Sequence, residues 1–91
     1  MTAHDVQALA DTAAGLILLH NGLWGAPECY MWAGADGDAA GRVPPWECEA
    51  LDRLRRRKLV APAPGSAVDD VPVVLTERGQ TTLRAGHPRA A

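Results

Sequence analysis

The sequence predicts an α+β fold in which a small helical bundle is followed by a β-hairpin and a final helix. Three observations predict it: a helical pattern near the N-terminus, a second one over 46–58, and two extended stretches separated by turn residues before a last helix. With 91 residues, the chain is long enough for one domain with one modest core. We therefore expect a single domain over 1–86 and a flexible tail over 87–91.

The first helix is predicted over 3–20. Thr2 and Asp5 have the spacing of a capping box, and apolar residues recur at intervals of three and four as far as Ile17. Gly22 lies where a left-handed residue would end this helix.

The segment 23–45 is harder to interpret. Pro27 with an acid behind it would start a short helix. A strand from Tyr30 to Trp32, ending in a glycine-rich turn, is the alternative. We predict the short helix and keep the strand open.

The next helix is predicted over 46–58. A proline and two glutamates suit its first turn, and the basic residues from Arg55 to Lys58 lie in its last turn, where the helix dipole favours cations. Leu51 and Leu54 supply its buried stripe.

A β-hairpin and a last helix are predicted after it. An extended stretch opens at Leu59, proline, glycine and serine occupy 62–66, and 71–75 is rich in valine. Thr76 can cap a last helix that ends near Ala85.

Two motifs in this half carry a resemblance to a known family. The first is L-D-R-L-R-R-R-K-L-V over 51–60, and the second is V-V-L-T-E-R-G over 73–79, followed by Leu83. Together they resemble winged-helix regulators of the MarR type. The resemblance implies that 46–58 is a recognition helix and that the hairpin is the wing.

The sequence departs from that family at three places. Lys58 replaces the glycine expected before Leu59, so it must either adopt a left-handed conformation or end the helix in another way. Asp69 and Asp70 stand near the wing tip in place of an arginine, and they would repel phosphate. The helix begins with Pro-Pro-Trp-Glu over 44–47, where small hydroxyl residues would approach base edges.

Charge is unevenly distributed along the chain. The net charge is −2, but residues 1–41 hold no lysine or arginine, whereas 42–91 hold all nine basic residues. Such asymmetry can orient a molecule in the field of a polyanion. The residues that we expect to contact duplex DNA are Arg42, Arg53, Arg55, Arg56, Arg57 and Lys58.

The same basic residues also fit a solvated helix face. Glu49 with Arg53, and Asp52 with Arg56, have the spacing of helical ion pairs. Arg57 and Lys58 lack such partners, so they are the better candidates for binding a ligand.

No motif points to an enzyme or to a metal. The chain has no phosphate-binding loop, nucleophile elbow or HExxH, and its two cysteines and three histidines match no common ligand spacing. We expect no cofactor. The tryptophans and the tyrosine are expected in the core, because phenylalanine is absent.

We therefore predict a DNA-binding transcriptional regulator, dimeric and cytoplasmic, without a membrane-spanning segment. The alternative is a winged-helix module that binds a protein partner and no DNA. An exposed apolar patch containing Trp24 or Trp32 would favour that alternative.

Overall fold

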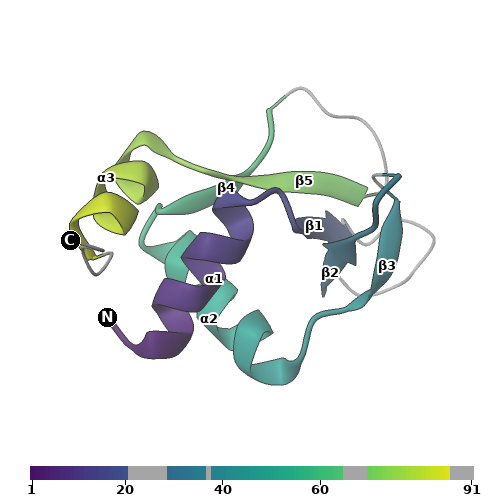
Figure 1. Ribbon diagram of the computed structural model, residues 1–91, viewed down its shortest axis with the longest axis horizontal. Coiled ribbons are helices and arrows are strands. Elements are labelled where there is room, and N and C mark those ends of the chain that lie inside the picture. The colour runs from purple at the N-terminus through teal and green to yellow at the C-terminus, as the bar shows by residue number, and fades with distance from the viewer. Residues whose placement is uncertain (21–28, 37, 65–69, 87–91) are drawn as a thin grey trace.

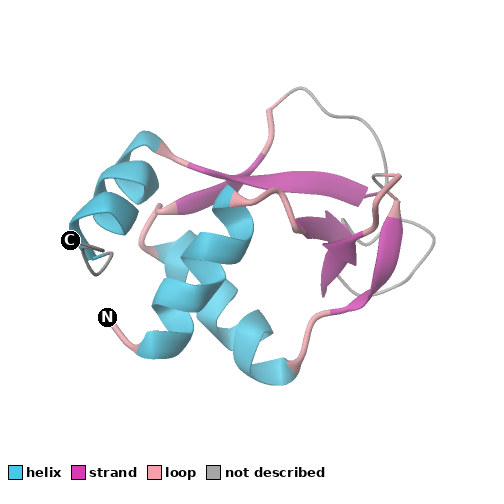
Figure 2. Cartoon of the chain, viewed as in Figure 1, coloured by secondary structure: helices cyan, strands magenta, loops and turns pink. Residues whose placement is uncertain are grey.

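The fold combines helices with one antiparallel sheet. A computed structural model describes residues 1–20, 29–36, 38–64 and 70–86. In chain order the elements are α1 (Ala3–Ala13), β1 (Ile17–His20), β2 (Cys29–Ala33), β3 (Ala39–Arg42), α2 (Pro45–Arg56), β4 (Val60–Pro62), β5 (Asp70–Leu75) and α3 (Glu77–Gly86). Figures 1 and 2 show α1 and α2 beside each other under the sheet, with α3 at the end of β5. The predicted α+β class is confirmed.

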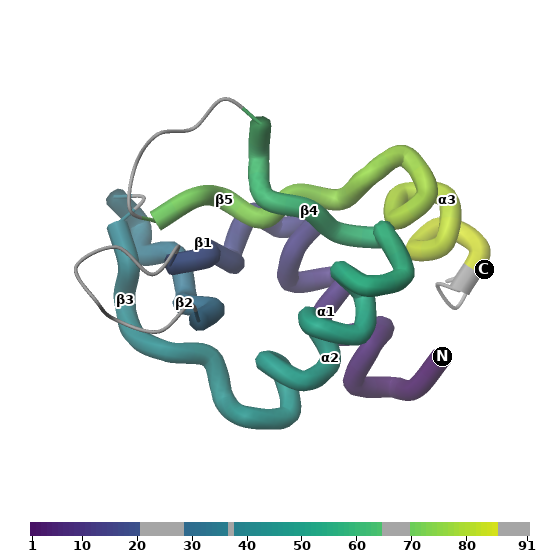
Figure 3. Tube along the Cα trace, turned by 180° about the vertical axis from the view of Figure 1, so that it is seen from behind, coloured from purple at the N-terminus to yellow at the C-terminus, as the bar shows by residue number. Residues whose placement is uncertain are grey.

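The sheet joins the two halves of the chain. Its strand order is β3-β2-β1-β5-β4, and all neighbours are antiparallel. Leu19 of β1 lies between Tyr30 of β2 and Val71 of β5. Figure 3 shows β3 at one end of this sheet and β4 towards the other. The N-terminal strand β1 therefore holds the C-terminal hairpin β4–β5 in place.

The first helix is shorter than the sequence predicted. The capping box forms as expected, with the Thr2 hydroxyl accepting a hydrogen bond from the Asp5 N–H at 3.1 Å. The helix ends at Ala13, and Gly15 follows with a φ of 75°, a conformation that costs glycine little. The prediction of a helix over 3–20 is wrong for 17–20, which form β1. Because β1 is flanked by strands and buried, its apolar run has no alternation that would mark it as a strand.

Within the segment 23–45, strands β2 and β3 form a second hairpin. Residues 29–33 are strand β2, so the predicted short helix is wrong there and the strand alternative is confirmed. Pro27, which was expected to start that helix, lies outside the described residues. Met31 pairs with Arg42 and Ala33 with Ala39, with a register shift between the two pairs.

The second half follows the prediction closely. Leu51 and Leu54 of α2 are fully buried, and β4 pairs with β5 from Val60 opposite Leu75 to Pro62 opposite Val73. The predicted helix over 46–58 ends two residues early, at Arg56.

The core lies between the helices and the sheet. It is built mainly from aliphatic side chains of α1, β1, α2 and the β4–β5 hairpin, with Tyr30 from β2. Its largest fully buried apolar side chains are Leu9, Ile17, Leu51, Leu54 and Val60. Within the described residues, no helix has the length and apolar character needed to cross a membrane.

Candidate nucleic-acid interface

The C-terminal cap of α2 positions the exposed cations at the end of this helix. Lys58 has a φ of 63°, so of the two alternatives that the sequence left open it adopts the left-handed conformation. The Leu59 N–H donates to the Leu54 carbonyl at 2.9 Å, and the Lys58 N–H donates to the Arg55 carbonyl at 3.0 Å. This is the Schellman pattern, with Leu59 and Leu54 packed in the core. It leaves the side chains of Arg57 and Lys58 exposed.

A second connection fixes the start of α3 against this helix end. The Thr76 hydroxyl accepts from the Gly79 N–H at 3.0 Å, as an N-cap, and donates to the Lys58 carbonyl at 2.6 Å. The Thr76 N–H also donates to the Leu59 carbonyl at 3.0 Å. Gly79 packs so closely that a Cβ there would collide with the Leu59 carbonyl oxygen. The backbone around Lys58 and the first turn of α3 therefore form one rigid unit.

An open groove runs along this unit. Its volume is about 660 Å³, and it is lined by Lys58, Thr76, Glu77, Arg78, Thr81 and Thr82. Arg78 of α3 lies in this groove close to Lys58, which is twenty residues earlier in the chain. Sequence reasoning used the Thr76 motif only as a helix cap and did not select Arg78. The signal was present in the hairpin itself, because a helix that follows β5 returns to the end of α2 where β4 begins.

Three side chains on this surface keep their charge available. In the described part of the chain, none of Arg57, Lys58 and Arg78 forms an ion pair. Each lies exposed at the end of α2 or the start of α3. Arg56 lies beside them, and its Nε donates to the Asp52 backbone carbonyl at 3.4 Å. We call Arg57, Lys58 and Arg78 the basic surface.

Arg53, one of the predicted DNA contacts, forms an internal ion pair. Its Nε and Nη2 donate to Oδ1 of Asp5 at 3.1 and 2.8 Å, which ties α2 to α1. Burial alone would raise the pKa of Asp5, but the bonds and charge of Arg53, together with the Thr2 N–H, bring that pKa below its ordinary value. Arg53 thus stabilises the helix pair.

Two further predicted contacts are separated from the basic surface. Arg55 is half-buried and acts on the pKa of Tyr30, which burial raises to about 12. Arg42 is exposed on β3, at the opposite end of α2. Since α2 has 12 residues, about 18 Å separates its two ends. Arg42 cannot contact the same phosphate as Lys58.

The rest of α2 offers a polyanion little attraction. Glu49 and Asp52 are exposed along its middle. Oδ1 of Asp70, at the start of β5, lies 3.2 Å from Nδ1 of His20, whereas Asp69 is outside the described residues. At the helix start, Trp46 is half-buried and its ring stacks on His4 with centroids 4.6 Å apart. On α2, the exposed cations without an acidic partner among the described residues therefore lie in the last turn, next to the first turn of α3.

The other candidate ligand residues do not gather. Among the residues that the structure describes, no group of three or more histidine, cysteine or acidic side chains could hold a metal ion, and Cys29 and Cys48 are free thiols. Trp32 is half-buried against the core, Tyr30 is buried, and Trp24 is outside the described residues.

Comparison of the chain with protein-family models, with curated proteins and with solved structures found no match in any of the three.

Proposed function

We propose that the chain is a small winged-helix regulator that binds duplex DNA through the phosphate backbone. The observation that carries the proposal is the basic surface, where Arg57, Lys58 and Arg78 are exposed and unpaired among the described residues. Phosphate contacts depend on such available cations. The order of α2, hairpin β4–β5 and α3 supports the winged-helix part of the proposal.

The geometry favours contact with phosphates over reading of bases. A recognition helix normally presents its first residues to base edges. Here Glu47 is buried and Trp46 is half-buried on His4, so the first turn of α2 has few side chains free for that role. Its last turn carries the cations instead. In the homodimer that we propose with this function, two copies of the basic surface would contact the duplex.

The salt dependence of binding tests this proposal. Each phosphate neutralised contributes a slope of about −0.9 to log K against log salt, so three cations predict about −2.7 per copy. Affinity for a fluorescently labelled duplex, measured by anisotropy, should then fall between roughly 50 and 200 mM salt by about 40-fold if one copy binds, and by about 1,800-fold if two copies bind together. In the Arg57→Ala, Lys58→Ala double variant, the slope should become shallower by about 1.8 on any sequence.

A matched pair of variants on α3 controls for net charge. Arg78 lines the groove beside Lys58, whereas Arg84 is exposed in the last turn of the same helix. Arg78→Ala should weaken binding and reduce the slope, and Arg84→Ala should leave both nearly unchanged. Equal effects of the two variants, or binding indifferent to the double variant, would reject the proposed surface.

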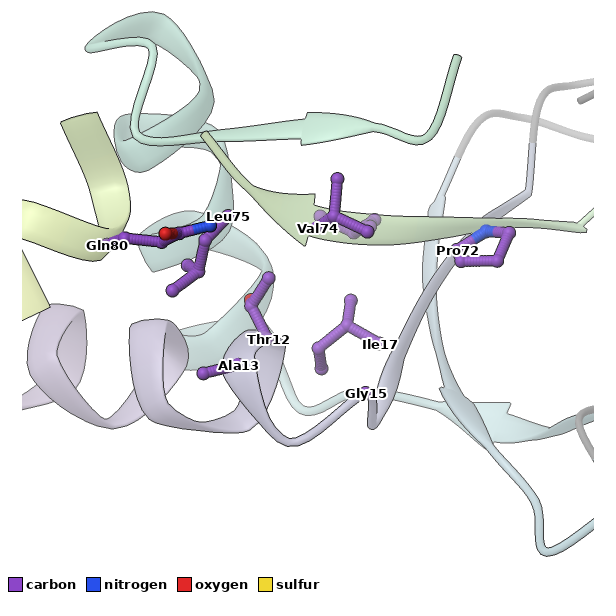
Figure 4. A pocket seen from close by; sticks show the side chains of 9 residues that line it. Thr12, Ala13, Gly15, Ile17, Pro72, Val74, Leu75 and Gln80 are labelled. Carbon is purple, nitrogen blue, oxygen red and sulfur yellow. The ribbon is translucent and has the colours of Figure 1, made fainter. Parts of the chain in front are cut away.

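A protein-binding role is the alternative, and an apolar groove favours it. A groove of about 410 Å³ lies where the end of α1 and the start of β1 meet β5, and its lining includes Ile17, Pro72 and Val74 (Figure 4). Val74 is 40% exposed, and Leu16, which precedes Ile17 in the sequence, is 41% exposed. If this alternative holds, the protein will not bind duplex DNA even at low salt. The Val74→Asp variant will then lose its binding to the protein partner.

A further inference from the structure

A buried carboxylate, that of Glu47, lies between α1 and α2, away from the basic surface. Glu47, in the first turn of α2, is 0% exposed. Among the described residues, no N–H or O–H group donates a hydrogen bond to either of its carboxylate oxygens. An ionised carboxylate in such a place is very costly, so the group favours its neutral form.

The local sequence explains why Glu47 is unpartnered. A glutamate at the third helical position normally bonds back to the backbone N–H of the N-cap residue. The N-cap of α2 is Pro44, which has no N–H to donate. The positive end of the helix dipole favours an anion here by about 0.3–1 kcal/mol, much less than the cost of burying one.

The group that faces Glu47 is another acid, Asp11 of α1. Asp11 is half-buried, and its Oδ1 accepts a hydrogen bond from Nε2 of Gln7 at 2.9 Å. Burial, followed by the hydrogen bond and charge of Asp11, raises the pKa of Glu47 to about 8. The Asp11 carboxylate is therefore the acceptor for the O–H of protonated Glu47.

The other titratable groups on the elements packed against α2 interact with other residues; on β2, Tyr30 interacts with Arg55 and Asp52. On α1, Asp5 is bonded to Arg53, and His4 stacks on Trp46. Strand β4, which also packs on α2, is Val-Ala-Pro and has no titratable side chain. Glu49, the neighbouring acid on α2 itself, is exposed.

We propose that Glu47 and Asp11 share one proton across the contact between α1 and α2, which makes the packing of these two helices sensitive to pH. The Glu47 carboxylic acid donates its O–H to the Asp11 carboxylate. When the proton leaves to solvent, two carboxylates face each other in a buried contact. This inference does not depend on DNA binding.

The direction of the pH effect follows from linkage. The folded chain keeps a proton until about pH 8, whereas unfolded Glu47 releases it near its ordinary pKa of 4.5. The contribution to stability is therefore complete below about pH 4.5, declines as the pH rises, and is lost above about pH 8. Between these limits the folding equilibrium constant should fall about tenfold per pH unit.

Urea denaturation across this pH range tests the proposal. Glu47→Gln removes the titratable group but keeps the shape of the side chain. It should therefore flatten the pH dependence of the free energy of unfolding between about pH 5.5 and 7.5. Asp11→Asn should weaken the dependence as well. Glu49→Gln, the control, changes an exposed acid on the same helix and should leave the slope as it is. An equal slope in the wild type and in Glu47→Gln would overturn the proposal.

A titration of the wild-type protein keeps the proposal falsifiable if a variant fails to fold. The carboxyl carbon of Glu47, followed by NMR, should titrate near pH 8. A midpoint near 4.5 would show that no proton is shared and would overturn the proposal.

Discussion

Replacing Lys58 with glycine should stabilise this protein although it removes a surface cation. Lys58 has a φ of 63° at the end of α2, in the left-handed region. The two backbone hydrogen bonds of the Schellman motif hold it there, from the N–H groups of Lys58 and Leu59. Glycine adopts this conformation without the clash of a Cβ.

The magnitude follows from two opposing effects. The left-handed conformation costs a residue with a Cβ about 1–2 kcal/mol. Glycine loses more backbone entropy on folding, which reduces the stabilisation by about 0.5–1 kcal/mol. The net expectation is a stabilisation of about 1 kcal/mol, which raises the melting temperature of a domain of this size by about 4–8 °C.

Thermal and urea denaturation of two glycine variants measure the effect. Arg57, the preceding residue, has a φ of −84° and gains nothing from glycine. Arg57→Gly should therefore lower stability by about 0.5–1 kcal/mol, although it removes the same charge. If Lys58→Gly is no more stable than Lys58→Ala, then the left-handed conformation carries no cost and the reasoning fails. Both Lys58 variants should lose duplex affinity equally, which separates stability from binding.

Three further substitutions test the contacts that hold the helices. Gly79→Ala should destabilise the fold by about 3 kcal/mol, because its Cβ would collide with the backbone of Leu59; an unchanged urea midpoint would show that α3 can shift freely. Thr76→Ala should cost about 1–2 kcal/mol and Thr76→Ser much less, since serine keeps the capping hydroxyl; equal losses would deny the cap. Asp5→Asn should cost about 1–2 kcal/mol at pH 7, an estimate reduced because Arg53 is 43% exposed. Because the pKa of Asp5 is lowered, the wild type should lose this advantage as the pH falls through that pKa, which denaturation at acidic pH can follow.

The second half of the chain was predictable because its signals are local. The pattern from Leu51 to Val60 contains the buried stripe, the basic last turn and the start of a strand within ten residues. Thr76 is a residue type that caps helices and directly precedes the last predicted helix, so a capped helix could be predicted from the local sequence. A left-handed Lys58 was one of two alternatives visible in the sequence, because the motif has glycine at that position.

The N-terminal half was less predictable because tertiary pairing decides its structure. Ile17 continues the helical spacing of α1, yet it begins strand β1, which lies between β2 and β5. Only the existence of both neighbouring strands makes an extended conformation there favourable. The fate of Arg53 has the same origin, since its partner Asp5 is 48 residues away and no spacing rule connects them. Its expected helical partner, Glu49, was four residues away.

The candidate surface was predictable in part. Arg57 and Lys58 were selected because no helical partner was available to them, and their side chains are exposed. Arg78 joins them through the hairpin, which brings α3 back to the end of α2. The charge pattern along the chain could identify the cations but could not identify which of them share a surface.

An NMR titration of the isotopically labelled protein with duplex DNA at low salt tests the central claim most directly. If the basic surface binds the duplex, the largest shifts will occur at the amides of Arg57, Lys58 and Arg78 and will disappear as salt is added. Shifts centred on Leu16 and Val74, or a spectrum that duplex DNA leaves unchanged, would contradict it.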